Sequence, residues 1–157
     1  MLPYISNGAL MNTRIETLSN KDIDDILLLE EACFTPCLRA SRETLHSRFD
    51  LGHIMLGLYI DENLVGVASF AYKWFDSKEE TKHFAQKQWR PFYQMEMSDT
   101  FNTVLIYNVE LLPSKRGIKH IYTLLNAMMK RASEDGCEFL IGVSRIPSYN
   151  GDPYNNI

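Results

Sequence analysis

One stretch of the 157-residue sequence decides the fold: Val109–Ile121, which reads VELLPSKRGIKHI. A hydrophobic run breaks at Pro113, passes through a basic loop and opens directly into a segment with helical periodicity. The first turn of a helix carries backbone N–H groups without intrahelical partners, at the positive end of the helix dipole. Because Arg116 and Lys119 add charge there and Gly117 lets the backbone approach closely, the loop is a natural seat for phosphate.

The segments on either side of this loop predict a strand–helix–strand unit. Thr103–Leu112 is a β-prone run, and Gly136 is predicted to end the helix at its C′ position. Glu138–Ser144 predicts a buried strand parallel to the first, so that the unit forms a βαβ crossover with the phosphate seat at its turn. The apolar stripe of the helix consists of Ile118, Ile121, Tyr122, Leu125, Met128, Met129 and Ala132.

The N-terminal half predicts two helices between strands. Thr13–Leu18 alternates like a short strand, and a helix follows from a capping box to about Phe34. Ser41 is placed to cap a second helix that ends near Phe49. Two apolar runs, His53–Ile60 and Leu64–Tyr72, predict a hairpin through the Asp-Glu-Asn turn between them.

Residues 73–102 show no clean period and are interpreted as an insertion with a helix around Glu79–Gln88. Its aromatic residues either wall an acceptor pocket or anchor the insertion to the core. We expect one domain over residues 13–149, with residues 1–12 as a leader or expression remnant and 150–157 as a tail.

Composition limits the function. The net charge of −4 argues against a general nucleic-acid binder, and no apolar run approaches the ~20 residues of a membrane span. Residues 1–10 do not resemble a secretory signal, so a cytoplasmic protein is expected. Cys33, Cys37 and Cys137 contain no C-x-x-C pair and predict reduced thiols without a special role. Since the four histidines are scattered, no metal site is predicted.

The element order, with a basic turn before the last helix, resembles the GCN5-related N-acetyltransferase (GNAT) family. That family has a Val-x-Val-x-Pro-like strand followed by Arg/Gln-x-x-Gly-x-Gly/Ala at a helix start. Here Val109-x-Leu111-x-Pro113 precedes RGIKHI, in which Arg116 matches. Lys119 and Ile121 stand where the two glycines are expected. Leu38–Leu45 and Ser144–Tyr149 also resemble segments of one large subgroup.

The resemblance implies an α/β (α+β) fold: a mixed central sheet flanked by helices, lacking part of the family's C-terminal half. It implies acetyl-CoA as co-substrate, with its pyrophosphate on the N–H groups of Gly117–Ile121. The pantetheine arm would pair like an extra strand with Val109–Leu111. The cofactor-binding residues expected are Val109, Leu111, Arg116, Gly117, Ile118, Lys119, His120 and Ile121.

Amine acylation needs a group that removes a proton from the acceptor and one that protonates the leaving thiolate. Glu110 is the candidate base, because alternation turns it away from the side of Val109 and Leu111; the alternative is a solvent-facing strand-end Glu. Tyr149 either acts as the acid or lines the acceptor site. Arg145 either belongs to the site or forms a structural ion pair, for example with Glu138 or Glu110.

Three functions remain open from the sequence. The first is acyl-CoA-dependent N-acetyl transfer to a primary amine of a small molecule or peptide. The second is a non-catalytic GNAT-like module that binds a protein partner, or a homodimer formed through an open sheet edge. The third is acyl transfer to a carrier-protein thiol. Since the sequence stops about where the family's last helix begins, we expect a fragment, a partner-completed domain or a reduced relative.

Overall fold

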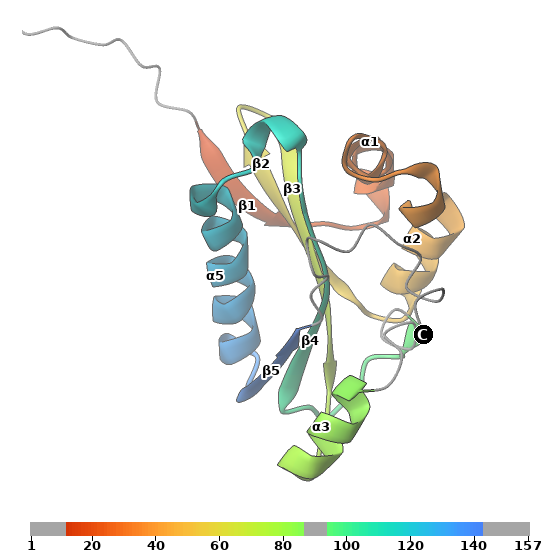
Figure 1. The fold of residues 1–157 in the computed structure, drawn as a ribbon, viewed down its shortest axis with the longest axis vertical. Coiled ribbons are helices and arrows are strands. Elements are labelled where there is room, and N and C mark those ends of the chain that lie inside the picture. Colours follow the sequence, from red (N-terminus) through yellow and green to blue (C-terminus); the bar gives the residue numbers. More distant parts are fainter. Residues whose placement is uncertain (1–11, 87–93, 143–157) are drawn as a thin grey trace, which may run out of the picture.

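The structure, a computed structural model, describes residues 12–86 and 94–142. A five-stranded sheet in the order β1-β2-β3-β4-β5 runs through its centre (Figure 1). All neighbouring strands are antiparallel except β4 and β5, which are parallel, as the βαβ prediction requires. The strands are β1 (Thr13–Thr17), β2 (Ile54–Ile60), β3 (Asn63–Lys73), β4 (Thr103–Leu111) and β5 (Phe139–Gly142).

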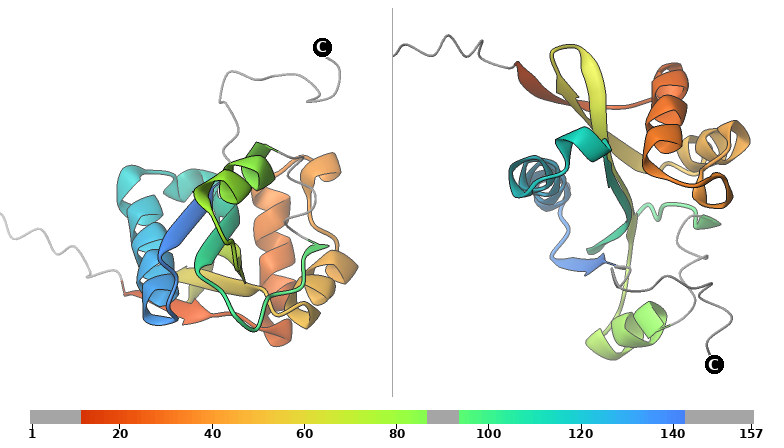
Figure 2. Two further views of the ribbon diagram at one scale, coloured as in Figure 1. Left: turned by 90° about the horizontal axis from the view of Figure 1, so that it is seen from below. Right: turned by 45° about the horizontal axis from the view of Figure 1, so that its top comes forward.

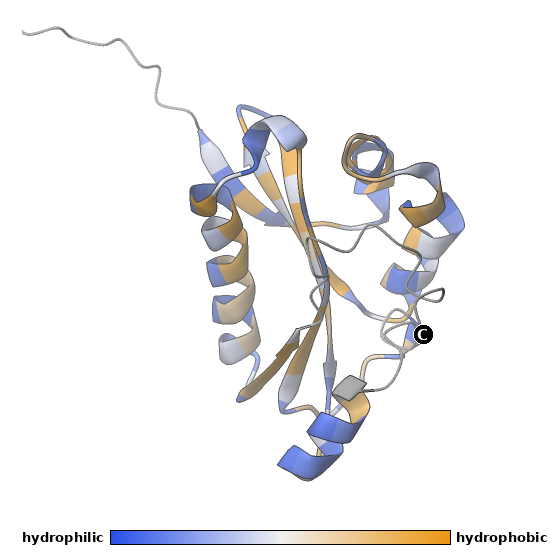
Figure 3. Ribbon diagram, viewed as in Figure 1, coloured by the Kyte–Doolittle hydropathy of each residue, from blue (hydrophilic) through white to orange (hydrophobic). Residues whose placement is uncertain are grey.

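Helices cover both faces of this sheet (Figure 2). On one face lies α5 (Ile118–Glu134), and on the other lie α1 (Ile23–Cys33) and α2 (Arg42–Asp50). Strand residues alternate between two apolar layers, one on each face of the sheet. Figure 3 shows in orange where hydrophobic residues lie along the strands and helices. Met55 packs under α1 and α2, whereas its neighbour Leu56 packs under α5. The predicted mixed sheet flanked by helices is therefore confirmed.

Local signals set the ends of these elements as predicted. Ser41 Oγ accepts a hydrogen bond from the Thr44 N–H (3.2 Å) and caps α2. Gly136 adopts a φ of 101° just after α5, a conformation that side chains disfavour. In the β2–β3 turn, Asp61 and Glu62 both have positive φ (46° and 71°), which matches the twist of a two-residue hairpin.

The apolar stripe predicted for α5 is only partly the face that the sheet covers. Leu124, Met128 and Ala132 are buried, and Leu124 lies outside the predicted stripe. Four predicted stripe residues are exposed instead: Ile118, Ile121, Tyr122 and Met129. The covered face follows positions four apart from Leu124 to Ala132, with the partly buried Leu125 packed beside it.

The prediction of a buried last strand is wrong. In β5 only Ile141 is buried, while Phe139 and Leu140 are exposed. The strand pairs with β4 alone and is the last in the order of the described sheet. Neighbours therefore cover only part of it.

Residues 73–102 begin as the end of β3 and contain α3 (Lys78–Gln86), close to the predicted helix. Asn102 ties the two ends of the segment together: it accepts from the Phe75 N–H (3.0 Å) and donates to the Phe75 carbonyl (2.8 Å). Phe75 is buried with Leu105 and contacts Phe84 at a ring distance of 5.1 Å. Of the two interpretations of its aromatic residues, anchoring to the core holds for these two; Trp89, Phe92 and Tyr93 lie outside the described residues.

Close packing of the sheet against α5 gives a stability prediction. A Cβ on Gly66 of β3 would lie 2.5 Å from Leu111 Cδ2 and 3.0 Å from the Glu110 carbonyl oxygen. Gly66→Ala is expected to lower the free energy of unfolding by about 1–3 kcal/mol, because strand and helix must shift apart. Urea denaturation measures this change.

Gly142→Ala is the matched control, since it changes a strand glycine whose Cβ position meets no atom of the described residues within 4 Å. It is expected to stay within about 0.5 kcal/mol of the wild type. Equal effects of the two substitutions would contradict the packing argument.

Candidate functional site

The site begins with unequal pairing of β4. This strand pairs with β3 over its whole length, up to the Leu111–Gly66 pair. It pairs with β5 only from Thr103 to Ile106. Among the described residues, no strand therefore lies along the second edge of β4 from Tyr107 to Leu111. A strand edge with free backbone groups is a template for an extended ligand.

A β-bulge marks the place where the two partners of β4 diverge. Ser69 pairs with Asn108 and Phe70 with Ile106, so Tyr107 is the extra residue. Bulges bend a strand and re-aim its side chains, and they are common beside functional sites. The sequence of β4 does not predict this feature, since it carries no glycine or other local signal of a bulge.

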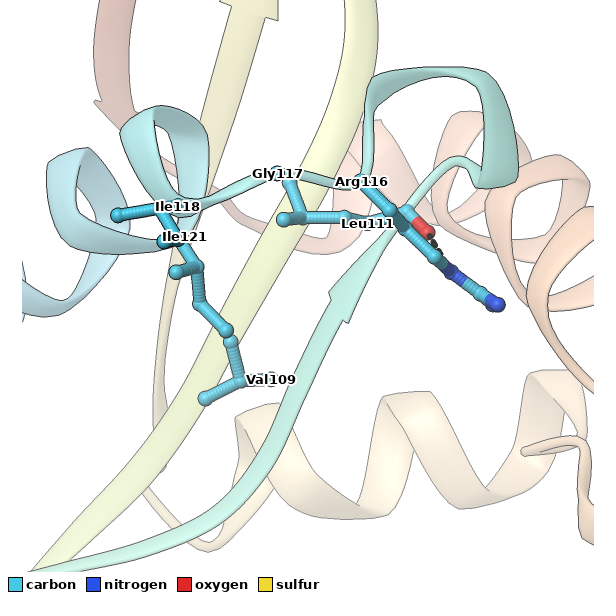
Figure 4. Close-up of a pocket in the computed structure, with 6 residues that line it drawn as sticks. All are labelled: Val109, Leu111, Arg116, Gly117, Ile118 and Ile121. Atoms are coloured by element: carbon cyan, nitrogen blue, oxygen red, sulfur yellow. Dashed lines mark hydrogen bonds between the residues drawn. The ribbon is translucent and has the colours of Figure 1, made fainter. Parts of the chain in front are cut away.

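A groove of about 390 Å³ lies beside this edge (Figure 4). Val109 and Leu111 of β4 form one wall, and Ile118 and Ile121 of the first turn of α5 form the other. Figure 4 shows the Ile121 side chain directed toward Val109. Gly117 is the N-cap and has no side chain to cap the helix, so ligand atoms can reach the first-turn N–H groups.

The structure thus brings six of the eight expected cofactor-binding residues to one groove. Lys119 and His120 lie on the first turn of α5 but do not line it. The Arg116 side chain runs away from Ile118 and Ile121, and its Nε donates to the Leu111 carbonyl (3.4 Å; Figure 4). The Arg116 backbone, rather than its guanidinium group, is on the groove side.

Glu110 lies on the opposite face of β4 from Val109 and Leu111, as alternation predicts. It is only 4% exposed, so the solvent-facing alternative is wrong. Asn108 shares this face and donates to Glu110 Oε1 over a long 3.4 Å. Within residues 12–86 and 94–142, Oε2 has no hydrogen-bond partner. A buried carboxyl group with so few partners favours its neutral form.

Burial raises the pKa of Glu110 to about 9, and the negative charge of Glu30 adds to this rise. The positive charge of Arg48 and the hydrogen bond from Asn108 oppose it. Both Glu30, on α1, and Arg48, on α2, are themselves buried. At neutral pH Glu110 therefore carries a proton, which suits a general acid better than the base predicted from the sequence.

A histidine that the sequence analysis left unassigned lies on the same face. Both ring nitrogens of His53 are hydrogen-bonded, Nε2 to the Met95 carbonyl and Nδ1 to the Tyr107 hydroxyl (2.8 Å). A carbonyl only accepts, so Nε2 carries the proton and the Tyr107 O–H donates to Nδ1. Burial lowers the pKa of His53, which keeps the ring neutral. The Tyr107 ring is thereby fixed beside His53, with a ring distance of 5.3 Å.

All three cysteines are free, and burial raises the pKa of both Cys33 and Cys137 to about 11, so these two are thiols at neutral pH. The Cys33 Sγ donates to the Leu111 carbonyl at 3.2 Å.

Two residues that the sequence predicts near the site, Tyr149 and Arg145, lie outside the described residues. In the described part of the chain, no three His, Cys, Asp or Glu side chains are close enough to hold a metal ion. No helix of that part has the length and apolar character needed to cross a membrane.

Comparison with known proteins places this geometry in a fold family. Neither the protein-family models nor the curated protein sequences include a match to the chain. Solved structures do match: the chain has the GNAT fold, with high-probability matches across many acetyltransferases. The chain thus has the fold that its sequence resembles, although Lys119 and Ile121 stand in the loop where two glycines are expected.

Three of these structures illustrate the range. The loading GNATL domain of CurA from Lyngbya majuscula has a TM-score of 0.69 at 17% identity, over 90% of this chain and 71% of that one. The GphF GNAT-like decarboxylase in complex with isobutyryl-CoA has 0.67 at 21%, over 87% and 68%. The aminoglycoside N-acetyltransferase AAC(6')-Iy in complex with CoA has 0.61 at 11%, over 86% and 78%.

The buried carboxyl group gives a prediction of pH-dependent stability. Its pKa is raised in the folded chain, so its contribution to stability is complete below the ordinary value of 4.5 and is lost as pH rises through about 9. Glu110→Gln cannot ionise and removes this loss. The Tm of the wild type is expected to fall relative to that of Glu110→Gln between pH 5 and pH 9. The fall should be roughly 2–4 °C for each kcal/mol by which ionisation of Glu110 lowers the free energy of unfolding.

Glu138→Gln, at an exposed position, is the control and should follow the wild type at every pH. Thermal unfolding followed by circular dichroism makes the measurement. A constant Tm difference between the wild type and Glu110→Gln would contradict the raised pKa.

Proposed function

We propose that this chain is an acyl-CoA-dependent N-acyltransferase that transfers an acetyl group to a primary amine of a small molecule or peptide. The observation that carries the proposal is the groove between the free edge of β4 and the first turn of α5. Its apolar walls suit a pantetheine arm, and its helix end suits a pyrophosphate. Two of the similar structures contain CoA or isobutyryl-CoA, which supports the choice of ligand.

In the proposed complex, the pyrophosphate accepts hydrogen bonds from the N–H groups of Gly117–Ile121. The pantetheine arm runs along β4 and pairs with its backbone from Val109 to Leu111, where no described strand pairs with this edge. Lys119 and His120 face the phosphates from outside the groove. This geometry holds the thioester at the edge of β4, between the groove and the face that carries Glu110.

The chemistry follows from the protonation state of Glu110. The amine nitrogen attacks the thioester carbon, a C–N bond forms and the C–S bond breaks. Glu110 gives its proton to the departing sulfur, and the carboxylate then takes the surplus proton from the acylated nitrogen. The products are an amide and free CoA thiol, with Glu110 protonated again. Tyr149, expected from the sequence as acid or acceptor-site residue, stays a candidate for the same proton step.

A second candidate acceptor is the thiol of a carrier protein. The similarity to a loading GNATL domain, with a TM-score of 0.69, supports this acceptor. Incubation with acetyl-CoA and either a panel of primary amines or a phosphopantetheinylated carrier protein separates the two acceptors. Intact-mass analysis detects both outcomes, because the acetyl group adds a defined mass to the acceptor that receives it, either an amine or the carrier protein.

Binding of acetyl-CoA is the direct test of the groove. Ile121→Glu places a carboxylate between the groove walls, where it repels the phosphates and blocks the arm. We expect the Kd for acetyl-CoA, measured by isothermal titration calorimetry, to rise at least tenfold, about 1.4 kcal/mol.

Met129→Glu is the matched control, because it adds the same charge to an exposed apolar position of α5 outside the groove. Its Kd should stay within about twofold of the wild type. No binding by the wild type, or equal weakening by the two variants, would overturn the proposal. A stable complex with a protein partner and no acetyl-CoA binding would instead support a non-catalytic module.

A further inference from the structure

Three buried charged side chains from three different elements meet beneath the free edge of β4. They are Glu30 of α1 (3% exposed), Arg48 of α2 (7%) and Glu110 of β4 (4%). Two carboxyl groups thus share the field of one buried guanidinium group: the charge of Arg48 acts on both, and the negative charge of Glu30 acts on Glu110. Two buried carboxylates beside one cation leave a net negative charge in an apolar layer, so one of them must take up a proton.

Hydrogen bonds decide which of the two keeps the proton. Glu30 Oε2 accepts a hydrogen bond from the Ala40 N–H at 2.9 Å, and a backbone donor favours the charged form of a carboxylate. Glu110 receives only the long contact from Asn108. Glu30 is therefore the better site for the negative charge, although burial also raises its pKa.

Other groups around the pair do not reverse this order. Asn108, on the same strand, is neutral, and Cys33 of α1 is held as a thiol because its pKa is raised to about 11. Arg116, from the loop after β4, interacts with Cys33 and the Leu111 carbonyl. The guanidinium carbon of Arg48 lies 5.3 Å from the centre of the Tyr107 ring, a cation–π contact that fixes the position of the charge.

We propose that Glu30 and Arg48 are positioning residues that act through Glu110. Glu30 holds the negative charge beside Arg48, and Glu110 consequently holds the proton that it gives to the leaving sulfur. The use of this proton rests on the proposed acyl transfer, whereas its location does not. Neither Glu30 nor Arg48 lines the groove. They affect the reaction through the protonation state of the Glu110 carboxyl group.

The location of the proton is tested by carbon NMR of the chain labelled with ¹³Cδ-glutamate. The signal that disappears in Glu110→Gln identifies Glu110. We expect it to titrate well above the ordinary carboxyl range in the wild type. In Glu30→Gln, which keeps an acceptor for the Ala40 N–H, the titration midpoint should fall by at least about one pH unit, because the negative charge of Glu30 that raises the pKa of Glu110 is removed.

Glu31→Gln is the matched control, since it removes the same charge from an exposed neighbour on the same helix. It should leave the midpoint of Glu110 unchanged, and Glu30→Asp should restore most of the wild-type value. An ordinary midpoint in the wild type would overturn the inference even if Glu30→Gln does not fold. So would a midpoint that Glu30→Gln leaves in place.

The use of the proton is tested by the pH profile of kcat/KM. If Glu110 is the acid, activity falls as pH passes its pKa, and Glu30→Gln moves this limb to lower pH by the same interval as the NMR midpoint. A shifted midpoint with an unmoved limb would overturn the catalytic part of the inference. Absence of all transferase activity, with the expected midpoints, would overturn the proposed function and leave the location of the proton established.

Discussion

The unequal hydrogen bonding of β4 is the constraint on which the rest of the site depends. One edge of the strand is joined to β3 along its full length, and the other is joined to β5 only as far as Ile106. The bulge at Tyr107 directly follows the last described pair between β4 and β5, Ile106 with Gly142. A sheet with both edges of β4 fully paired would leave no room beside Val109 and Leu111, because the neighbouring strand would fill the groove.

Alternation then gives the two faces of the open half of β4 different characters. Val109 and Leu111 face α5 and belong to an apolar cluster with Leu124, which makes that side suited to an uncharged arm with a polar end at Gly117. Glu110 and Asn108 face α1 and α2, where Glu30 and Arg48 supply the charge. Neighbouring residues of β4 thus lie on two different surfaces. Val109 and Leu111 belong to the proposed binding surface, and Glu110 belongs to the surface proposed to hold the proton.

The sequence predicts those parts of this arrangement that local physics controls. Ser41, Gly136 and the turn after Ile60 set the ends of their elements through their own conformation, so the sheet and its βαβ unit could be derived before the structure. The groove followed for the same reason, since its walls come from neighbouring segments of Val109–Ile121. The bulge, the side-chain direction of Arg116 and the partners of Glu110 could not be derived, because each depends on residues distant in the sequence.

The buried charges are the strongest argument that the α1–α2 face serves more than stability. A buried ion pair is often no more stable than apolar residues of the same volume, and a second carboxyl group adds a further desolvation cost. Elsewhere the same core is built from residues such as Ile26, Leu45 and Met55. The ionisable groups gather instead at the one place where β4 has a free edge, beside the Tyr107–His53 hydrogen bond. A structural role alone would not require charge at that position, whereas proton transfer at the edge of β4 would.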